Sequence, residues 1–197
     1  MSNSIDYYLS LISPWSYLGH ERLQKMAREY DVEIKVHPVD FSTIFPATGG
    51  IPLPKRSSQR IEYRMQELIR WRDHLKLPLT LEPQHFPVRD RQPATMVVNL
   101  RKKDPAAAIN LTGAFLRAVW VEQRDISDRE TLLAIARENN QDGNALLNDS
   151  TSSAKTIAKD TKEAVSRGIF GAPSYVYQDQ IYWGQDRLDF LCRALAK

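Results

Sequence analysis

The sequence predicts an α/β fold in which two parts of one domain are separated by a long helical segment. Three observations lead to this prediction. The chain begins with a strand–helix–strand pattern, its middle is a run of helical patterns, and it ends with a helix, a hairpin and a final helix. The 197 residues, 42% of them hydrophobic, are enough to bury a core. We therefore expect a β-α-β…α-β-β-α domain with a large all-helical insertion.

The first part, residues 1–50, contains the strand–helix–strand pattern. Residues 5–12 are rich in β-branched and aromatic side chains, and residues 32–39 alternate as a half-exposed strand does. Residues 17–30 between them have the apolar spacing of a helix. A helix that connects two strands in this way predicts a parallel pair with a right-handed crossover.

The other two parts follow from the same periodicities. Residues 51–148 form the predicted helical insertion, because a block of this length is too long for a loop. Its helical patterns cover residues 61–75, 93–102, 106–121, 128–138 and 142–147. Residues 149–197 complete the domain with a helix at 151–167, strands at 174–177 and 180–183 around Gln178-Asp179, and a helix at 187–196.

A motif with the spacing of a redox active site lies where the first strand meets the first helix. Residues 13 to 16 read Ser-Pro-Trp-Ser, a C-x-x-C pattern with oxygen in place of both sulfurs, which removes disulfide chemistry. Ser followed by Pro is also the ordinary way to begin a helix. A helix N-terminus favours an anion. Since Ser13 is not itself a thiolate, the thiol of bound glutathione is the natural candidate, with Ser13 donating a hydrogen bond to its sulfur.

A second motif, Gly171-Ala172-Pro173, leads into the predicted hairpin. Proline cannot donate to a strand ladder, so it belongs at the start or edge of a strand, and the bond before it can be cis. In thioredoxin-like folds a cis-Pro loop faces the C-x-x-C helix. By that similarity Ala172 offers its backbone N–H and C=O to a peptide across the site, and glutathione is such a peptide.

A third motif, Trp183-Gly184-Gln185-Asp186-Arg187-Leu188, precedes the last helix. One interpretation is a plain strand-to-helix turn in which Asp186 or Gln185 caps the helix. The other is a site for the γ-glutamyl end of glutathione, whose ammonium needs an anionic partner and whose carboxylate suits a helix N-terminus.

Together these segments resemble the family of 2-hydroxychromene-2-carboxylate isomerases, which have a DsbA-like thioredoxin fold, and their relatives, the kappa-class glutathione transferases. The resemblance covers nearly the whole chain. It includes Ser13 to Gly19, Thr48-Gly49-Gly50, Arg70-Trp71, His85-Phe86-Pro87, Ala118-Val119-Trp120, Asp125-Ile126-Ser127, Phe170 to Pro173 and Gly184 to Leu188.

The resemblance implies a glutathione-dependent cis-trans isomerase that interconverts 2-hydroxychromene-2-carboxylate and trans-o-hydroxybenzylidenepyruvate, or a related substrate of aromatic hydrocarbon catabolism. The glutathione thiolate adds to a conjugated double bond, the resulting single bond rotates, and elimination releases intact glutathione. Ser13 is the implied catalytic residue, acting as a donor to sulfur and not as a nucleophile. The implied glutathione-binding residues are Ser13, Ala172, Pro173, Trp183, Gly184, Gln185 and Asp186.

The implied substrate is a small aromatic carboxylate, but this chain departs from the family pattern around it. Phe45 stands where the chromene isomerases carry a Lys, and Gly49-Gly50 stands where the family often has Gly-Asn. The basic patch from Lys55-Arg56 to Arg60 is either a solvated loop or an anion site for the substrate carboxylate, because Arg presents a fork of donors. The expected substrate-binding residues are Trp15, Phe45, Lys55, Arg56 and His85.

Composition argues against several other classes of function. The formal charge is only +3, with Lys and Arg scattered among acids, so nucleic-acid binding has little support. Residues 1–10 do not have the pattern of a secretory signal, no stretch is apolar enough to span a membrane, and the histidines share no metal-ligand spacing. Cys192, the only cysteine, is expected to be a small buried residue. We therefore expect a cytoplasmic protein without a bound metal, and the resemblance suggests a homodimer.

Two other functions stay open from the sequence. A kappa-like transferase would use the same thiolate but release a glutathione conjugate. A non-catalytic peptide-binding module would keep the groove at Ala172-Pro173 and turn over no electrophile. A protein disulfide oxidoreductase has the least support, because the chain has no C-x-x-C pair.

Overall fold

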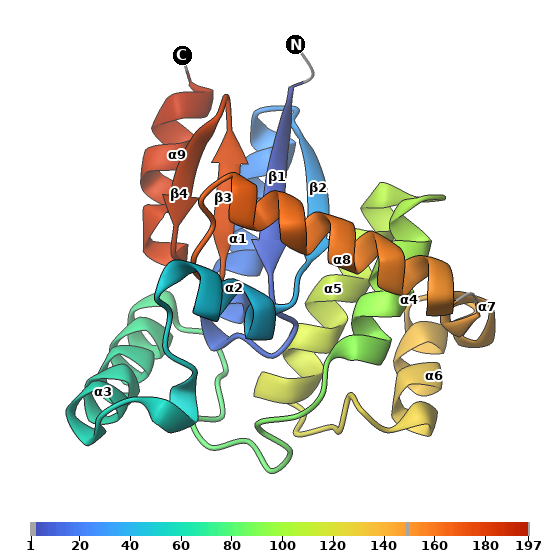
Figure 1. Ribbon diagram of the computed structural model, residues 1–197, viewed down its shortest axis with the longest axis horizontal. Coiled ribbons are helices and arrows are strands. Elements are labelled where there is room, and N and C mark those ends of the chain that lie inside the picture. Colours follow the sequence, from blue (N-terminus) through green and yellow to red (C-terminus); the bar gives the residue numbers. More distant parts are fainter. Residues whose placement is uncertain (1–2, 149, 197) are drawn as a thin grey trace.

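The computed structural model describes residues 3–148 and 150–196, and its centre is a four-stranded mixed sheet (Figure 1). The strands are β1 (Ser4–Leu9), β2 (Glu33–Pro38), β3 (Ser174–Tyr177) and β4 (Gln180–Trp183). Their order is β2-β1-β3-β4, with β1 and β2 parallel and the other two pairs antiparallel. The predicted parallel pair and C-terminal hairpin are both confirmed.

Helices surround this sheet and account for every predicted helical segment within about three residues. They are α1 (Pro14–Glu29), α2 (Phe41–Thr48), α3 (Ser58–Leu75), α4 (Arg91–Arg101), α5 (Pro105–Trp120), α6 (Arg129–Glu138), α7 (Gly143–Leu147), α8 (Ser150–Ser166) and α9 (Leu188–Leu195), with short 3₁₀ turns η1 (Leu53–Lys55) and η2 (Gln185–Arg187). No helix in the described part of the chain is long and apolar enough to cross a membrane.

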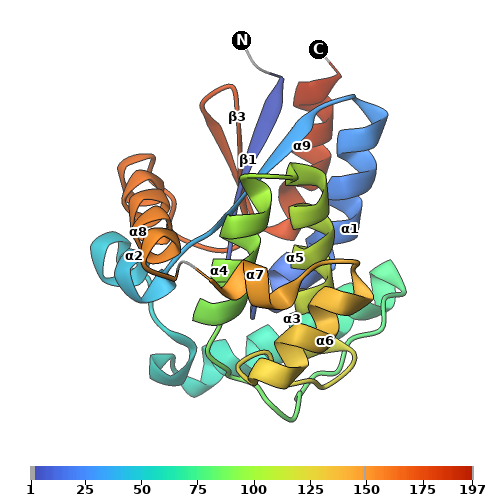
Figure 2. The same cartoon turned by 90° about the vertical axis from the view of Figure 1, so that its right-hand side faces the viewer.

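The sheet has a helical layer on each face. Figure 2 shows α1 and α9 on one side of the strands, and α2 and α8 on the other. Strand β1 is buried on both faces, because Tyr7 and Leu9 belong to the core toward α1 while Tyr8 packs with Ile44 and Ala164 toward α2 and α8. Such a strand is expected at the centre of a three-layer structure.

Part of the predicted insertion shares the core of the sheet. Helices α4 and α5 lie beside β2, and their buried residues form one continuous cluster with those of α1 and β1. The Arg101 side chain at the end of α4 donates a hydrogen bond to the Val36 carbonyl of β2, with an N–O distance of 2.6 Å. Asp149, the first residue of the predicted third part, lies outside the described residues, as do Met1 and Ser2 at the N-terminus.

Three local features differ from the sequence-based expectations. Strand β1 ends at Leu9 instead of residue 12, because the chain turns where the Ser13 N–H donates to the Ser10 carbonyl. Helix α2 was not predicted: Pro46 in its middle is typical of a helix break. Cys192 is half-buried, and its sulfur lies 3.4 Å from the Tyr30 hydroxyl.

Candidate active site

The N-terminus of α1 holds Ser13 in a position to donate a hydrogen bond. Ser13 is the N-cap residue, with extended backbone angles, and its Oγ accepts a hydrogen bond from the Ser16 N–H at 3.2 Å. Pro14 fills the first helical position. Capping uses a lone pair of the Ser13 oxygen and leaves its hydroxyl hydrogen free, so capping and donation to a ligand are compatible.

The second serine of the motif has a different environment. The Ser16 side chain is fully buried, and its Oγ has no hydrogen-bond partner among the described residues. Ser13 lines an open cleft, whereas Ser16 does not. Only the first position of the C-x-x-C-like motif is therefore available to a ligand.

The loop before β3 forms the opposite wall of the cleft. The Ala172–Pro173 peptide bond is cis. The loop is held from both sides, because Ser174 Oγ donates to the Gly171 carbonyl at 2.7 Å and the Gly184 N–H donates to the Pro173 carbonyl at 2.9 Å. Within the described residues, neither the N–H nor the C=O of Ala172 forms a hydrogen bond. This leaves one free donor and one free acceptor beside the cleft.

Trp183, at the end of β4, covers this loop closely. A Cβ atom added to Gly171 would lie 2.2 Å from the Trp183 Nε1 atom, so only glycine fits there without a shift of the indole. The Trp183 ring also packs against Phe170, with 4.7 Å between ring centroids, and is half exposed. These two aromatic residues form one end of the cleft.

The turn after Trp183 is anchored to α1. Gln185 is buried, and its side-chain oxygen accepts a hydrogen bond from Arg22 at 3.0 Å. Asp186 is partly exposed and forms an ion pair of 3.2 Å with Arg187. Of the two interpretations of this turn, the one in which Gln185 or Asp186 caps the last helix is wrong, because residues 185–187 form a 3₁₀ turn and Arg187 is the N-cap residue of α9.

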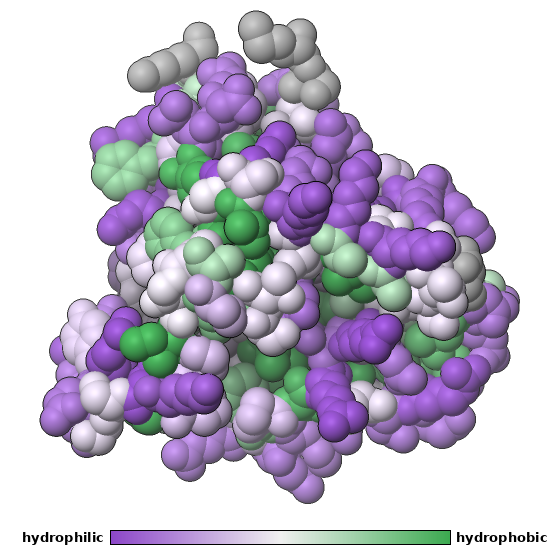
Figure 3. All heavy atoms as spheres, viewed as in Figure 1, coloured by the Kyte–Doolittle hydropathy of each residue, from purple (hydrophilic) through white to green (hydrophobic). Residues whose placement is uncertain are grey.

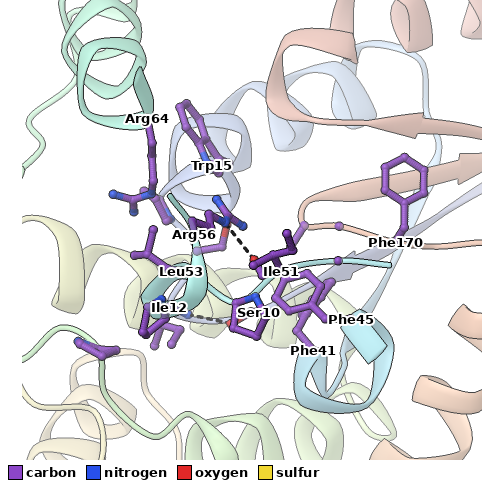
Figure 4. A pocket seen from close by; sticks show the side chains of 18 of the residues that line it. Ser10, Ile12, Trp15, Phe41, Phe45, Ile51, Leu53, Arg56, Arg64 and Phe170 are labelled. Carbon is purple, nitrogen blue, oxygen red and sulfur yellow. Dashed lines mark hydrogen bonds between the residues drawn. The ribbon is translucent and has the colours of Figure 1, made fainter. Parts of the chain in front are cut away.

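These walls enclose a cleft of about 730 Å³. Figure 3 shows this side of the molecule hollowed below α2, with apolar side chains deep in the hollow and hydrophilic residues around it. The close view in Figure 4 shows that the labelled lining residues come from the β1–α1 loop, the start of α1, α2, the segment after α2, α3 and the loop before β3.

The cleft brings together some of the predicted site residues and not others. Those that line it are Ser13, Trp15, Phe45, Arg56, Ala172 and Trp183. Those that do not are Lys55, His85, Pro173, Gly184, Gln185 and Asp186. His85 lies 4.0 Å from Asp125, although the next two residues, Phe86 and Pro87, do line the cleft.

Three arginines line the cleft, and Arg64 was not singled out from the sequence. Arg56 donates from Nε to the Ile51 carbonyl at 2.9 Å, an interaction visible in Figure 4. The Arg64 guanidinium lies over the Phe86 ring, 5.9 Å from its centroid. Burial, with a further contribution from Arg56, lowers the pKa of Arg64 to about 10. Burial and the charge of Arg60 likewise lower the pKa of Arg56.

A partly buried acid that contacts Ser10, a residue of the cleft lining, was also missed. The Asp90 carboxylate accepts a hydrogen bond from Ser10 Oγ at 2.8 Å, and burial raises its pKa against the effect of that bond. Asp90 lies 80 residues from Ser10 in the chain, so no local pattern links them. Because it bonds Ser10 and not Ser13, it is not placed as a base for Ser13. Among the described residues, no group of three or more His, Cys, Asp or Glu side chains is arranged to hold a metal.

Comparison with known proteins places this geometry in a family. Residues 4–196 match the family model of the DSBA-like thioredoxin domain. The chain is 34% identical over 194 residues to a 2-hydroxychromene-2-carboxylate isomerase of Sphingobium xenophagum, covering 97% of each chain. It is 26% identical to human glutathione S-transferase kappa 1, covering 100% of this chain and 92% of the relative.

Solved structures agree on the fold. A crystallised 2-hydroxychromene-2-carboxylate isomerase superposes with a TM-score of 0.81 at 24% identity, covering 98% of this chain and 94% of the other. The cytosolic disulfide reductase DsbM of Pseudomonas aeruginosa superposes with a TM-score of 0.71 at 18% identity, covering 98% of each chain. The chain belongs to the DsbA-like thioredoxin family and, within it, to the 2-hydroxychromene-2-carboxylate isomerases.

Proposed function

We propose that the protein is a glutathione-dependent cis-trans isomerase that interconverts 2-hydroxychromene-2-carboxylate and trans-o-hydroxybenzylidenepyruvate, or a close analogue from aromatic catabolism. One observation carries the proposal. Ser13 has a free hydroxyl hydrogen at a helix N-terminus and lines the same cleft as Ala172, whose backbone donor and acceptor are unpaired. This arrangement suits a cysteine-containing peptide whose sulfur lies against Ser13.

Glutathione would be held mainly by backbone groups and by one partly exposed acid, Asp186. The Ala172 N–H and C=O would pair with its cysteinyl residue, as an edge strand pairs with a peptide. Asp186 would bind the γ-glutamyl ammonium. Its ion pair with Arg187 is at the surface, so replacing Arg187 with the ammonium as the partner of Asp186 costs little free energy. Pro173, Gly184 and Gln185 would act indirectly by fixing the loops, and Trp183 would cover the peptide.

The site would lower the pKa of the glutathione thiol. A free cysteine thiol has a pKa near 8.5. A helix N-terminus contributes up to about 2 kcal/mol, and a hydrogen bond to a charged acceptor about 1.5 to 3 kcal/mol. If half of this is realised, the pKa falls by roughly two units at about 1.4 kcal/mol per unit. Most of the bound thiol would then be thiolate at neutral pH.

The cleft would also hold the acceptor that this thiolate attacks. Trp15, Phe45 and Phe86 supply flat apolar walls for an aromatic ring, and Arg56 supplies a cation for the carboxylate. Lys55 and His85 lie outside the cleft lining, so we assign them no contact with the acceptor. No His, Asp or Glu side chain is among the described lining residues, which agrees with a reaction driven by thiolate addition without a nearby base.

Titration of bound glutathione tests the proposal. Thiolate absorbance near 240 nm is followed with pH in the presence of the protein, and a bound pKa about two units below that of free glutathione is expected. Isomerisation is then assayed with chromene carboxylates, with glutathione measured before and after turnover.

The outcomes separate the candidate functions. Isomer formation with glutathione fully recovered supports the isomerase. A conjugate that accumulates in proportion to glutathione consumed would identify a kappa-like transferase, a possibility raised by the 26% identity to the human kappa enzyme. Binding without turnover of any electrophile would identify a peptide-binding module.

A further inference from the structure

All ionisable side chains that line the cleft carry positive charge. Among the described lining residues these are Arg56, Arg60 and Arg64, with no Asp, Glu, Lys or His. None of the three arginines forms an ion pair with an acid in the described part of the chain. The cleft is therefore a concentration of uncompensated cations in a chain whose formal charge is only +3.

The three arginines lie close together, and the repulsion between their positive charges would be relieved by a bound anion. Arg60 and Arg64 are four residues apart on α3, where like charges destabilise a helix. Mutual repulsion is evident in the pKa values: beyond the effect of burial, Arg56 lowers the pKa of Arg64 and Arg60 lowers that of Arg56. Charges that disfavour one another without a counterion are typical of a binding site for an anionic ligand.

Two of the guanidinium groups are also fixed in orientation. The Arg56 Nε–H is used by the Ile51 carbonyl, which leaves its terminal nitrogens free. The Arg64 guanidinium lies over the Phe86 ring, 5.9 Å from its centroid, and Figure 4 shows Arg56 and Arg64 near each other. A guanidinium over an aromatic face keeps its N–H donors available to a ligand, because the ring accepts none of them in a directed hydrogen bond. The site thus presents several oriented donors beside apolar walls, which matches an aromatic acid.

We propose that these arginines bind the 2-oxo acid end of the acceptor, with Arg56 and Arg60 on the carboxylate and Arg64 on the oxo oxygen. This inference rests on the proposed function and extends it to Arg60 and Arg64. The role of Arg64 follows from its position, since Arg64 is half-buried over the Phe86 ring whereas Arg60 is exposed, and a charge acts more strongly on a ligand away from water.

The reaction explains why a cation belongs at the oxo oxygen. When the thiolate forms a C–S bond to the β-carbon of the enone, the C=C electron pair moves to a new C=C bond, and the carbonyl pair moves onto oxygen. The oxo group becomes an enolate, and the former double bond can rotate. Return of the electron pair expels the thiolate, so no atom, proton or electron is gained or lost. Arg64 stabilises an oxygen that becomes fully charged only after addition.

The test compares two acceptors that differ by one charge, 2-oxo-4-phenylbut-3-enoate and the neutral 4-phenylbut-3-en-2-one, assayed with glutathione. Arg60→Gln should raise KM for the acid about tenfold and leave the ketone unchanged, because only the acid has a carboxylate. Arg64→Gln should lower kcat about 10- to 100-fold for both acceptors, because both form an enolate. Arg64→Lys keeps the positive charge but lacks the paired N–H donors of a guanidinium, so its kcat should lie between those of the wild type and Arg64→Gln.

Arg70→Gln is the matched control. Arg70 lies on the same helix, does not line the cleft and pairs with Glu67, so its loss should change neither acceptor. Unaltered kinetics in Arg60→Gln and Arg64→Gln would overturn the inference. So would a weakened affinity for glutathione with acceptor kinetics intact, which would assign the arginines to the glycine carboxylate of glutathione.

A second measurement separates this inference from the proposed function. Binding of the unreactive saturated acid 2-oxo-4-phenylbutanoate is followed by tryptophan fluorescence, since Trp15 and Trp183 line the cleft. If no acceptor is turned over but this acid binds and Arg60→Gln weakens it about tenfold, the anion site stands and the isomerase proposal fails. If the acid does not bind to the wild-type protein, the anion site is refuted.

Discussion

Replacing Ser13 with alanine removes two separate contributions that can be measured apart. The first is helix capping, since Ser13 Oγ accepts from the Ser16 N–H. Loss of an N-cap costs about 1 kcal/mol, which for a chain of this size lowers Tm by about 2 to 4 °C. The second is donation to the glutathione sulfur, worth about 1.5 to 3 kcal/mol, or roughly one to two pKa units.

The sign of the second effect follows from which form the hydroxyl stabilises. Donation favours the thiolate, so Ser13→Ala should raise the pKa of bound glutathione by roughly one to two units. The N-terminus of α1 remains, so the pKa should stay below that of free glutathione. The alkaline rise of the isomerisation rate should move to higher pH by the same amount, and the rate at pH 7 should fall accordingly.

Asp104→Ala is the matched control for the capping effect. Asp104 caps α5 by accepting from the Ala107 N–H at 2.8 Å and does not line the cleft. Both variants should lose similar Tm in calorimetry, and only Ser13→Ala should shift the thiolate absorbance titration. Equal losses of stability with no shift in the thiol pKa would show that Ser13 is a helix cap alone, and would refute the proposed site.

Two further variants test the loops and the sheet that hold the site. Gly171→Ala would place a Cβ 2.2 Å from the Trp183 Nε1 atom, and the resulting overpacking would cost about 1 to 3 kcal/mol. Glutathione binding, measured by calorimetric titration, should therefore weaken about tenfold. An unchanged affinity would contradict the tight contact. Burial opposes protonation of His37, but the carboxylate of Asp160, 3.6 Å away, and the hydrogen bond to Asp6 outweigh burial and raise the His37 pKa. The charge of His37 therefore stabilises the fold below pH 6.5, and this stabilisation is lost as pH rises through the raised pKa. Asp160→Asn also removes the ion pair with Arg101, so it should lower stability by about 3 kcal/mol, and it should flatten the fall in Tm as pH rises above 6.5. An equally steep fall in Tm would show that Asp160 does not set the His37 pKa.

Local patterns were enough to predict most of the secondary structure. Both strands of the C-terminal hairpin have the predicted bounds, and the positive φ angles of Gln178 and Asp179 match the tight turn expected there. These elements depend on alternation and on turn chemistry within a few residues. Helix α2 escaped prediction because its stability depends on Ile44 packing against Tyr8 and Ala164, which outweighs the cost of Pro46.

Periodicity and capping along the chain were enough to predict the fold and to place Ser13 at a helix N-terminus, and the resemblance of the ordered motifs was enough to predict the family. The composition of the cleft, in contrast, became clear from the packing of distant segments. This packing placed Arg64 beside Arg56, brought Asp90 to Ser10 across 80 residues, and left Lys55 and His85 outside. The physical reason is that the pKa of a group and its access to a ligand depend on burial and on charges a few ångströms away, which chain distance does not specify.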